Sequence, residues 1–514
     1  MNLSSHLYEL VKQLSPHEKG YVQKLALAHS RNAGQNKYSL LLDAVDAQEE
    51  YDEALLIKNL GYSDNPNNFA SVKKYLYDFI LRSLEDYHEI PKNEVRRMLN
   101  QVEILFQKNL QDQCTKLLEK AEKLALKYQF YDLLLEICDW QQYLQIDLDP
   151  TEKNEEKVEE NRTRFFELLN NFAEEFELRC DFSVFMMRWR RKGYARNENE
   201  FTNEINAKRL EKYPELKTFF GNYFALYLRL QISMDQYNYP EALAVIQKIN
   251  ALWDKHPNMK EIKQKSYASS MFYFSVVQMA NFDITGMNKS LEKVDALIAQ
   301  NYLVKEKLNF SVLFFKFDAS IYMGETEKAI GLYKQIQQEF LLLSEKEKNS
   351  SLAFDYYLRL AIWELITGNI KEAIQSINAS IDVTGASYRS DVYCFAQIVS
   401  LIVYFESGKE DLLVYKTKSV YRFLLKRKRL YQLENLVLSF IRNTIFKINS
   451  KKEEKAAFIK MKEKLTEVLK DPFEKKALFI FDLSTWLDSK IQQKNFMEVK
   501  RLSFEEELKG GVRK

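Results

Sequence analysis

A short turn motif recurs along this chain at nearly constant spacing, and it constrains the fold more than any other feature. In YMGETEKAI, Gly324 is followed five residues later by Ala329, and LITGNIKEAIQSI repeats the pair as Gly368 and Ala373. Comparable turns are marked by Asn109, Tyr237, Asn281, Gly408 and Lys451. From Tyr237 onward the marks lie 40 to 44 residues apart, and the interval from Asn109 to Tyr237 spans three such periods. The spacing indicates a structural repeat.

A period of about 43 residues fits two helices of roughly 18 residues each and two short turns. Helix-breaking residues are scarce, with 13 glycines and 8 prolines among 514 residues. The period also predicts turns near residues 151 and 194, and the tetrapeptide YLRL recurs three periods apart, at 227–230 and 357–360. One helix pair cannot bury its apolar face alone, whereas stacked pairs can. The sequence therefore predicts an all-α fold, a right-handed α-solenoid of antiparallel helix pairs. The alternative is an ordinary helical protein with a turn every ~20 residues.

The units FDASIYMGETEKAIGLYKQIQQ and LAIWELITGNIKEAIQSINASI resemble tetratricopeptide repeats. The matching positions are the turn glycine and the alanine five residues later, and the resemblance covers roughly residues 95 to 470. The period is longer than the ~34 residues of that family, and most units lack its Trp, Tyr and terminal Pro. The whole chain also resembles bacterial proteins of this kind whose activity is not known. The resemblance implies a scaffold whose concave groove, lined by the first helix of each unit, binds a protein or peptide.

Three regions are expected: an N-terminal helical bundle or cap at 1–90, repeats at 91–470, and C-terminal capping helices with a frayed tail at 471–514. In the first region SPHE (15–18) is a capping box, and Gly61 ends a helix. A DNA-reading helix-turn-helix is disfavoured there, because residues 1–100 carry 12 Lys and Arg against 14 Asp and Glu. In the third region DPFE resembles a capping box that opens a last long helix.

Composition and motifs exclude several function classes. No apolar leader is visible, and the longest apolar run, AQIVSLIVYF, is far shorter than the ~20 residues of a bilayer span. The four cysteines lie far apart, as in a reducing compartment. No phosphate-binding, zinc-binding or nucleophile-elbow motif is present. We therefore expect a cytoplasmic protein with no catalysis, cofactor or metal; its oligomeric state is not predicted.

A basic stretch stands out at 412–452, where 11 Lys and Arg accompany one acid, Glu434. On a continuous helix, four of these side chains would share one face. These four are Lys418, Arg422, Lys426 and Arg429. The face is either a binding surface for nucleic acid, acidic peptide or anionic membrane, or simply a solvated helix surface. A smaller cluster, MRWRRKGYAR, is better explained by cations stabilising a helix C-terminus.

A second candidate surface follows from counting back equally from each turn. This places six residues at two successive positions of first helices, one turn apart, where a concave groove would lie. They are Tyr227, Gln231, Met271, Ser275, Phe314 and Asp318. The alternative is that these residues form the core between helices, since a shift of one residue rotates the face by about 100°.

Two functional hypotheses follow. The first is a non-catalytic scaffold or adaptor that binds a protein or peptide. The alternative is a regulatory protein with an N-terminal helical domain and a repeat sensor that contacts nucleic acid through the basic surface at 412–452.

Overall fold

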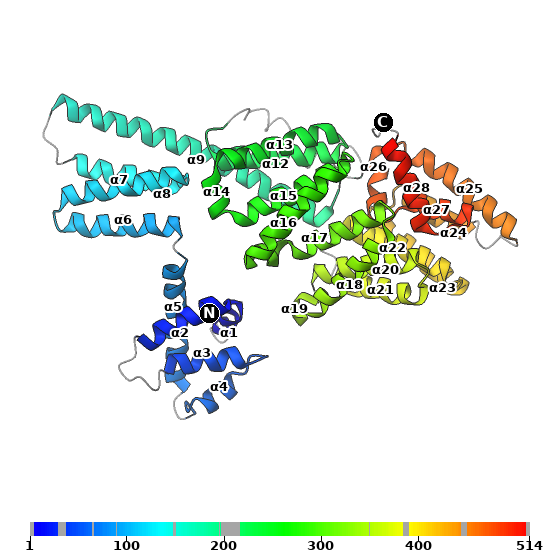
Figure 1. The fold of residues 1–514 in the computed structure, drawn as a ribbon, viewed down its shortest axis with the longest axis horizontal. Coiled ribbons are helices and arrows are strands. Elements are labelled where there is room, and N and C mark those ends of the chain that lie inside the picture. Colours follow the sequence, from blue (N-terminus) through cyan, green and yellow to red (C-terminus); the bar gives the residue numbers. More distant parts are fainter. Residues whose placement is uncertain are drawn as a thin grey trace. The chain divides into compact units, whose positions relative to one another are not determined.

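The computed structural model describes residues 5–28, 37–63, 66–88, 90–146, 151–194, 196, 216–348, 350–383, 390–443 and 450–509. Within these residues the fold is all-α and helical-repeat-like, with one short 3₁₀ helix and no strand. This confirms the predicted class. The chain divides into two compact units, Met1–Leu169 and Asn170–Lys514, with the boundary inside one helix (Figure 1). Each unit is described by itself.

Unit 1 begins with a bundle of short helices around one apolar core. They are α1 (His6–Gln13), α2 (Pro16–Ala28), α3 (Lys37–Ala47), α4 (Glu53–Asn59) and α5 (Pro66–Tyr87). The predicted capping box opens α2, because Ser15 N–H donates to the Glu18 carboxylate at 2.7 Å and Glu18 N–H donates to Ser15 Oγ at 3.3 Å. Gly61 follows α4 with φ +73°, as its turn position requires.

The remaining helices of unit 1 are α6 (Pro91–Gln107), α7 (Gln111–Lys127), α8 (Tyr131–Gln145) and the first part of α9 (Glu152–Lys192). Among them, α6 packs on α7 and α7 on α8, and α9 is joined to α8 by a hydrogen bond from Asn161 Nδ2 to the Cys138 carbonyl at 2.9 Å. The period predicted two helices between turns near residues 151 and 194, but α9 is a single helix of 41 residues that ends before Gly193. No glycine or proline interrupts its sequence, so the backbone has no local reason to turn. Residues 147–150, at the first expected turn, lie outside the described residues.

Unit 2 holds the end of α9 and the helices that follow it. The first group is α12 (Phe219–Asp235), α13 (Tyr239–Lys255), α14 (Pro257–Ile262), α15 (Gln264–Ala280), α16 (Ile284–Gln300), α17 (Tyr302–Tyr322) and α18 (Thr326–Leu341). The second is α19 (Glu345–Lys348), α20 (Ser351–Ile366), α21 (Ile370–Val383), α22 (Ser390–Glu406), α23 (Glu410–Lys426), α24 (Gln432–Asn443) and α25 (Lys451–Val468). The third is α26 (Pro472–Lys475), the 3₁₀ helix η2 (Lys476–Phe479), α27 (Leu483–Gln492) and α28 (Phe496–Lys509). Consecutive long helices pack in pairs, among them α12 with α13, α15 with α16, and α20 with α21.

Most of the recurring turns have one backbone conformation. Six of them have a residue with positive φ two positions after the last residue of the helix, and these residues are Asn109, Tyr237, Phe282, Gly324, Gly368 and Gly408. Lys451, expected to mark a seventh turn, is instead the first residue of α25, and residues 444–449 before it lie outside the described residues. At Gly324 the glycine N–H donates to Ile321 C=O at 3.1 Å, and the next N–H, of Glu325, donates to Ser320 C=O at 2.8 Å. This is a Schellman motif, which satisfies the last carbonyl groups of the helix. The third turn residue is Phe282, one position after the Asn281 expected from the sequence.

The small residues after these turns are buried, as their spacing suggested. Ala242, Ala329 and Ala373 are fully buried, and Cys114 occupies the same position in its turn. Paired helices can approach closely where a side chain is this small. The same short stretch of sequence therefore determines both the turn and the close packing of the two helices that it joins.

The C-terminal region differs from its prediction. No last long helix begins at DPFE, because α26, η2, α27 and α28 are separate short elements. Asp471 caps α26 by accepting a hydrogen bond from Phe473 N–H at 2.8 Å. The Glu474 carboxylate, expected to complete the capping box, instead accepts hydrogen bonds from the N–H groups of Gln432 and Leu433, at the start of α24. The Glu474 carboxylate thus binds the start of a helix distant in the sequence instead of capping its own helix.

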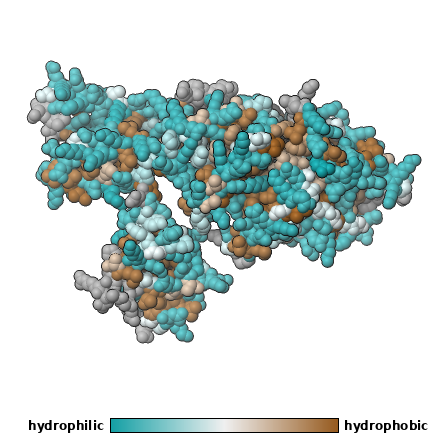
Figure 2. All heavy atoms as spheres, in the orientation of Figure 1, coloured by the Kyte–Doolittle hydropathy of each residue, from teal (hydrophilic) through white to brown (hydrophobic). Residues whose placement is uncertain are grey.

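The face of the molecule seen in Figure 2 is mostly hydrophilic, with scattered apolar residues. Among the described residues, no helix combines the length and the apolar character needed to cross a bilayer.

Candidate functional site

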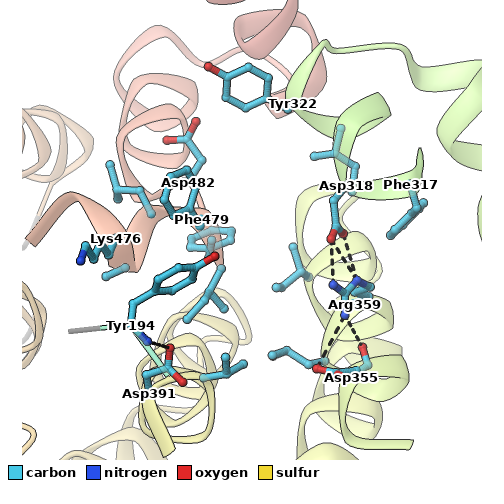
Figure 3. A pocket seen from close by; sticks show the side chains of 18 of the residues that line it. Tyr194, Phe317, Asp318, Tyr322, Asp355, Arg359, Asp391, Lys476, Phe479 and Asp482 are labelled. Carbon is cyan, nitrogen blue, oxygen red and sulfur yellow. Dashed lines mark hydrogen bonds and ion pairs between the residues drawn. The ribbon is translucent and has the colours of Figure 1, made fainter. Parts of the chain in front are cut away.

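Unit 2 contains a pocket of about 330 Å³ whose walls come from segments far apart in the sequence (Figure 3). One wall is formed by α17 and α20. Ile321 and Asp318 of α17 lie 41 residues before Ile362 and Arg359 of α20, and all four line the pocket. This wall therefore combines the first helices of two consecutive pairs, in which Asp318 and Ile362 occupy matching positions because the turn residues Gly324 and Gly368 are 44 residues apart.

A charged cluster lies on this wall. The Arg359 guanidinium donates from Nη2 to Asp318 at 2.8 Å and from Nε to both oxygens of the same carboxylate at 3.1 Å. Its Nη1 donates to the backbone carbonyl of Asp355 at 3.2 Å, and the Asp355 carboxylate lies 3.8 Å away. The guanidinium also stacks over the Phe314 ring at 4.4 Å. Arg359 is thus held between two carboxylates at the pocket surface, as Figure 3 shows.

The second wall comes from the C-terminal region, residues 476–482 and α28. Lys500 Nζ lies 2.7 Å from the Asp482 carboxylate, which also caps α27 by accepting the Thr485 N–H at 3.0 Å. Burial raises the pKa of Asp482, but Lys500 and the Thr485 donors outweigh it and hold this pKa below its usual value. Lys476 lies 3.4 Å from Asp235 of α12, and both side chains are buried. The cations of this wall are therefore paired inside the protein.

The third wall comprises Tyr194, Arg196 and the start of α22. Tyr194 N–H donates to the Asp391 carboxylate at 3.2 Å. Arg196 lies between two buried carboxylates, 2.9 Å from Glu434 and 3.0 Å from Glu474. Burial lowers the pKa of Arg196, but the two carboxylates outweigh it and raise this pKa overall. The ion triad joins the segment after α9 to α24 and α26.

The six residues expected along a groove do not form one surface. Tyr227, Met271, Ser275 and Phe314 are buried in the core, which corrects their expected placement in an open groove. The hydroxyl of Tyr227 donates to Ser270 Oγ at 3.2 Å, so its polar end is satisfied inside the protein. Gln231 of α12 is half-buried and outside the pocket lining.

Asp318 alone among those six lines the pocket. Phe314 and Asp318 are one turn apart on the same face of α17. The Arg359 side chain covers the Phe314 ring, whereas the Asp318 carboxylate, which pairs with Arg359, stays exposed.

The basic residues expected on one face are also divided. Lys418, Arg422 and Lys426 are exposed on α23. Arg429 is not on this face, because α23 ends at Lys426 and Lys428 takes φ +55°. Arg429 is buried instead and donates to Ser390 Oγ at 3.3 Å. A Schellman turn ends the helix here, with Lys428 in the position that glycine usually occupies. Arg429 therefore lies beyond the helix and off the predicted face.

Sequence reasoning missed most of the pocket. Arg196 ends the basic cluster MRWRRKGYAR, but nothing in the sequence pointed to its partners, which lie up to 278 residues away, or to the partner of Lys476, 241 residues away. The sequence did contain a signal for Arg359: it is the arginine of the second copy of the repeated tetrapeptide YLRL, at 357–360.

The described residues contain no cluster of three or more His, Cys, Asp or Glu arranged to hold a metal ion. Cys394 is buried, and burial raises the pKa of its thiol to about 11, so little of the nucleophilic thiolate exists at neutral pH. The polar groups of the pocket can form ion pairs and hydrogen bonds with a bound molecule.

Comparison with known proteins gives no relative: no protein-family model matches the chain, and no curated protein or solved structure is significantly similar to it.

Proposed function

We propose that this protein is a non-catalytic scaffold of tetratricopeptide-like helical repeats, which binds a protein or peptide in the pocket of unit 2. The observation that carries the proposal is the wall that α17 and α20, the first helices of two consecutive pairs, form together. Asp318 and Ile321 of one helix pair, and Arg359 and Ile362 of the next, present polar and apolar groups side by side to the same space. An array of stacked pairs offers such a surface to an extended partner.

The size and lining of the pocket support the proposal. A volume of about 330 Å³ is near the lower end of ligand pockets, which suits a few side chains of a peptide. The half-buried apolar side chains of Ile321, Ile362 and Val392 offer contacts, and the surrounding ion pairs offer hydrogen bonds. A right-handed solenoid of antiparallel pairs, in a bacterial cytoplasmic protein, is the setting that we propose for this site.

Filling the pocket tests the proposal. Random dodecapeptides displayed on phage are selected on the wild-type protein, and the enriched peptides are titrated by calorimetry. We expect micromolar binding to the wild type and at least about tenfold weaker binding to Ile362→Trp, because the larger ring occupies the apolar part of the pocket. Leu341→Trp, at an exposed position of α18, is the matched control and should bind as wild type does. Equal binding to both variants would place the peptide elsewhere and contradict the proposal.

A second candidate function is contact with nucleic acid through the basic face, defined as Lys418, Arg422 and Lys426. These side chains are exposed and share one face of α23. The only acid of the stretch 412–452, Glu434, is buried against Arg196 and does not offset their charge at the surface. Exposed Tyr415, one turn before Lys418, offers a ring on which a base could stack.

The salt dependence of binding tests this second function. Fluorescence anisotropy with a single-stranded RNA is recorded from 50 to 200 mM salt for wild type and for Lys418→Glu/Arg422→Glu/Lys426→Glu. If each side chain contacts one phosphate, the slope of log K against log salt should become smaller by about 2 in the variant. The control Lys116→Glu/Lys120→Glu/Lys123→Glu makes the same charge change on the exposed face of α7. No binding by the wild type at 50 mM salt would eliminate this function.

A further inference from the structure

The part of helix α9 that belongs to unit 2 carries an exposed apolar stripe. The stripe consists of Ala173, Phe176, Cys180, Val184 and Met187, all of them exposed. Phe176 has 51% of its surface exposed, Val184 has 45% and Met187 has 69%. Single exposed apolar residues are ordinary, but a continuous row of them along about 21 Å of one helix indicates a surface that binds another protein.

The stripe lies on the face of α9 that points away from the protein core. The opposite face contributes Leu178 and Phe185, which are buried in one cluster with residues of α12. Phe176 and Cys180 are each two residues from Leu178, which places them about 200° around the helix from it. Met187 has the same relation to Phe185. One apolar face of α9 is therefore used inside unit 2, and the other is left for a second partner.

The spacing of the stripe is symmetric about Cys180. Ala173 and Met187 lie seven residues to either side of it, and Phe176 and Val184 lie four residues to either side. Two copies of α9 that pair antiparallel about Cys180 therefore place each Phe176 against Val184 of the other copy. They also place each small Ala173 against the long side chain of Met187, so that large and small residues fit together across the contact.

Exposed charges beside the stripe favour the antiparallel orientation. Glu174 lies near the N-terminal end of the stripe and Arg191 lies beyond its C-terminal end, and both side chains are exposed. A parallel pair would place each of these charges opposite the same charge of the other copy, and like charges repel. In an antiparallel pair Glu174 approaches Arg191 of the other copy, because long side chains on a helix lean toward its N-terminus.

We propose that two copies of this chain associate through α9, with their stripes packed antiparallel about a two-fold axis at Cys180. The contact is isologous, because the same residues of both copies form it. It extends over about four helical turns, which is short for a permanent dimer, so the two copies associate reversibly. The inference is independent of the proposed function, since the stripe does not line the pocket.

The oligomeric state of the full chain tests the association. Sedimentation velocity is recorded under reducing conditions at protein concentrations from 1 to 100 µM. We expect the wild type to dimerise with a dissociation constant on the order of 10 µM. Phe176→Glu/Val184→Glu should weaken dimerisation at least about tenfold, because it places charges in an apolar contact. Leu341→Glu/Leu342→Glu makes the same charge change at two exposed apolar positions at the end of α18 and should dimerise as wild type does.

Cysteine cross-linking tests the orientation of the two helices. Cys180 is exposed and the other three cysteines are buried, so copper-catalysed air oxidation should link two wild-type chains through Cys180. With Cys180→Ser present, Ala173→Cys/Met187→Cys should cross-link the antiparallel pair, because residue 173 faces residue 187 of the other copy. Ala173→Cys with Cys180→Ser alone should not, because positions 173 of the two copies lie about 21 Å apart, beyond the reach of a disulfide. Leu341→Cys with Cys180→Ser measures cross-linking by random collision.

Each outcome supports or overturns the inference. A dimer that is lost in Phe176→Glu/Val184→Glu, and that is cross-linked by the 173 and 187 pair above the level of random collision, would support it. The cross-link is a gain that a misfolded variant cannot give. A wild type that stays monomeric at 100 µM would overturn the inference, as would a dimer that persists in Phe176→Glu/Val184→Glu. Efficient cross-linking by Ala173→Cys alone would show parallel helices and overturn the proposed arrangement.

Discussion

At the scale of single residues, Glu364 shows how burial changes the chemistry of an ordinary side chain. It lies on α20, buried, and accepts a hydrogen bond from the Tyr333 hydroxyl at 3.1 Å. Burial raises the pKa of its carboxyl group, although the hydroxyl groups of Ser376 and Tyr333 oppose the change. The folded protein therefore favours the protonated acid more than the unfolded chain does.

This shift predicts a dependence of stability on pH. Because the folded-state pKa of Glu364 is above its unfolded value, its stabilising contribution is complete at low pH and is lost as pH rises through the folded-state pKa. Glu364→Gln should therefore be more stable than wild type at pH 7, by about 1 kcal/mol, and should show little gain at pH 4. Urea denaturation at the two pH values measures the difference. Glu327→Gln, at an exposed position of α18, should show no such pattern; an equal gain at both pH values would contradict the explanation.

The residues predicted to line a groove differ in which way their side chains face. The sequence placed Tyr227 and Met271 in one equivalent position and Asp318 one helical turn further along its own helix, but it did not determine which way each side chain faces. Successive residues on a helix are separated by about 100°, so a small error in register exchanges core and surface. Only the packed structure places Asp318 at the pocket and the other two inside.

At the scale of helices and turns, Gly324 joins the repeat to the C-terminal region. Its φ is +70°, and a Cβ atom there would lie 2.6 Å from the backbone N and Cα of Arg501 in α28. The adjacent Tyr322 ring packs against Phe504 of the same helix, and its hydroxyl donates to Glu507 at 2.7 Å. The turn is therefore both the end of α17 and the place where α28 docks.

Substitution by alanine should separate these two roles. Gly368 has a similar φ, +84°, but a Cβ atom there would meet no other part of the described chain within 4 Å, so Gly368→Ala costs only the backbone strain, about 1 kcal/mol. Gly324→Ala should cost about 2 kcal/mol more, because the methyl group must displace the α28 backbone. Urea denaturation of both variants measures the two losses in the free energy of unfolding. Equal losses would show that α28 can move away from residue 324 at no cost, which would contradict the explanation.

At the scale of the whole molecule, buried ion pairs connect distant parts of unit 2. The repeat contacts by themselves join only helices that are close in the sequence. Arg196 pairs with Glu434 and Glu474 across 238 and 278 residues, and Lys476 pairs with Asp235 across 241. Desolvated charges are costly to leave unpaired, so these contacts favour one arrangement of the segments. They place residues 476–482 opposite α17 and α20 and thereby complete the pocket.

The sequence by itself determined the helical class, the positions of most repeat turns and the capping box of α2. These features depend on residues a few positions apart, so their causes are visible in a short stretch of sequence. Only the tertiary structure decided the continuous helix α9, the end of α23 before Arg429, and the walls of the pocket. Those outcomes depend on which distant groups pack and pair with one another, and in unit 2 the partners lie as much as 278 residues apart in the sequence.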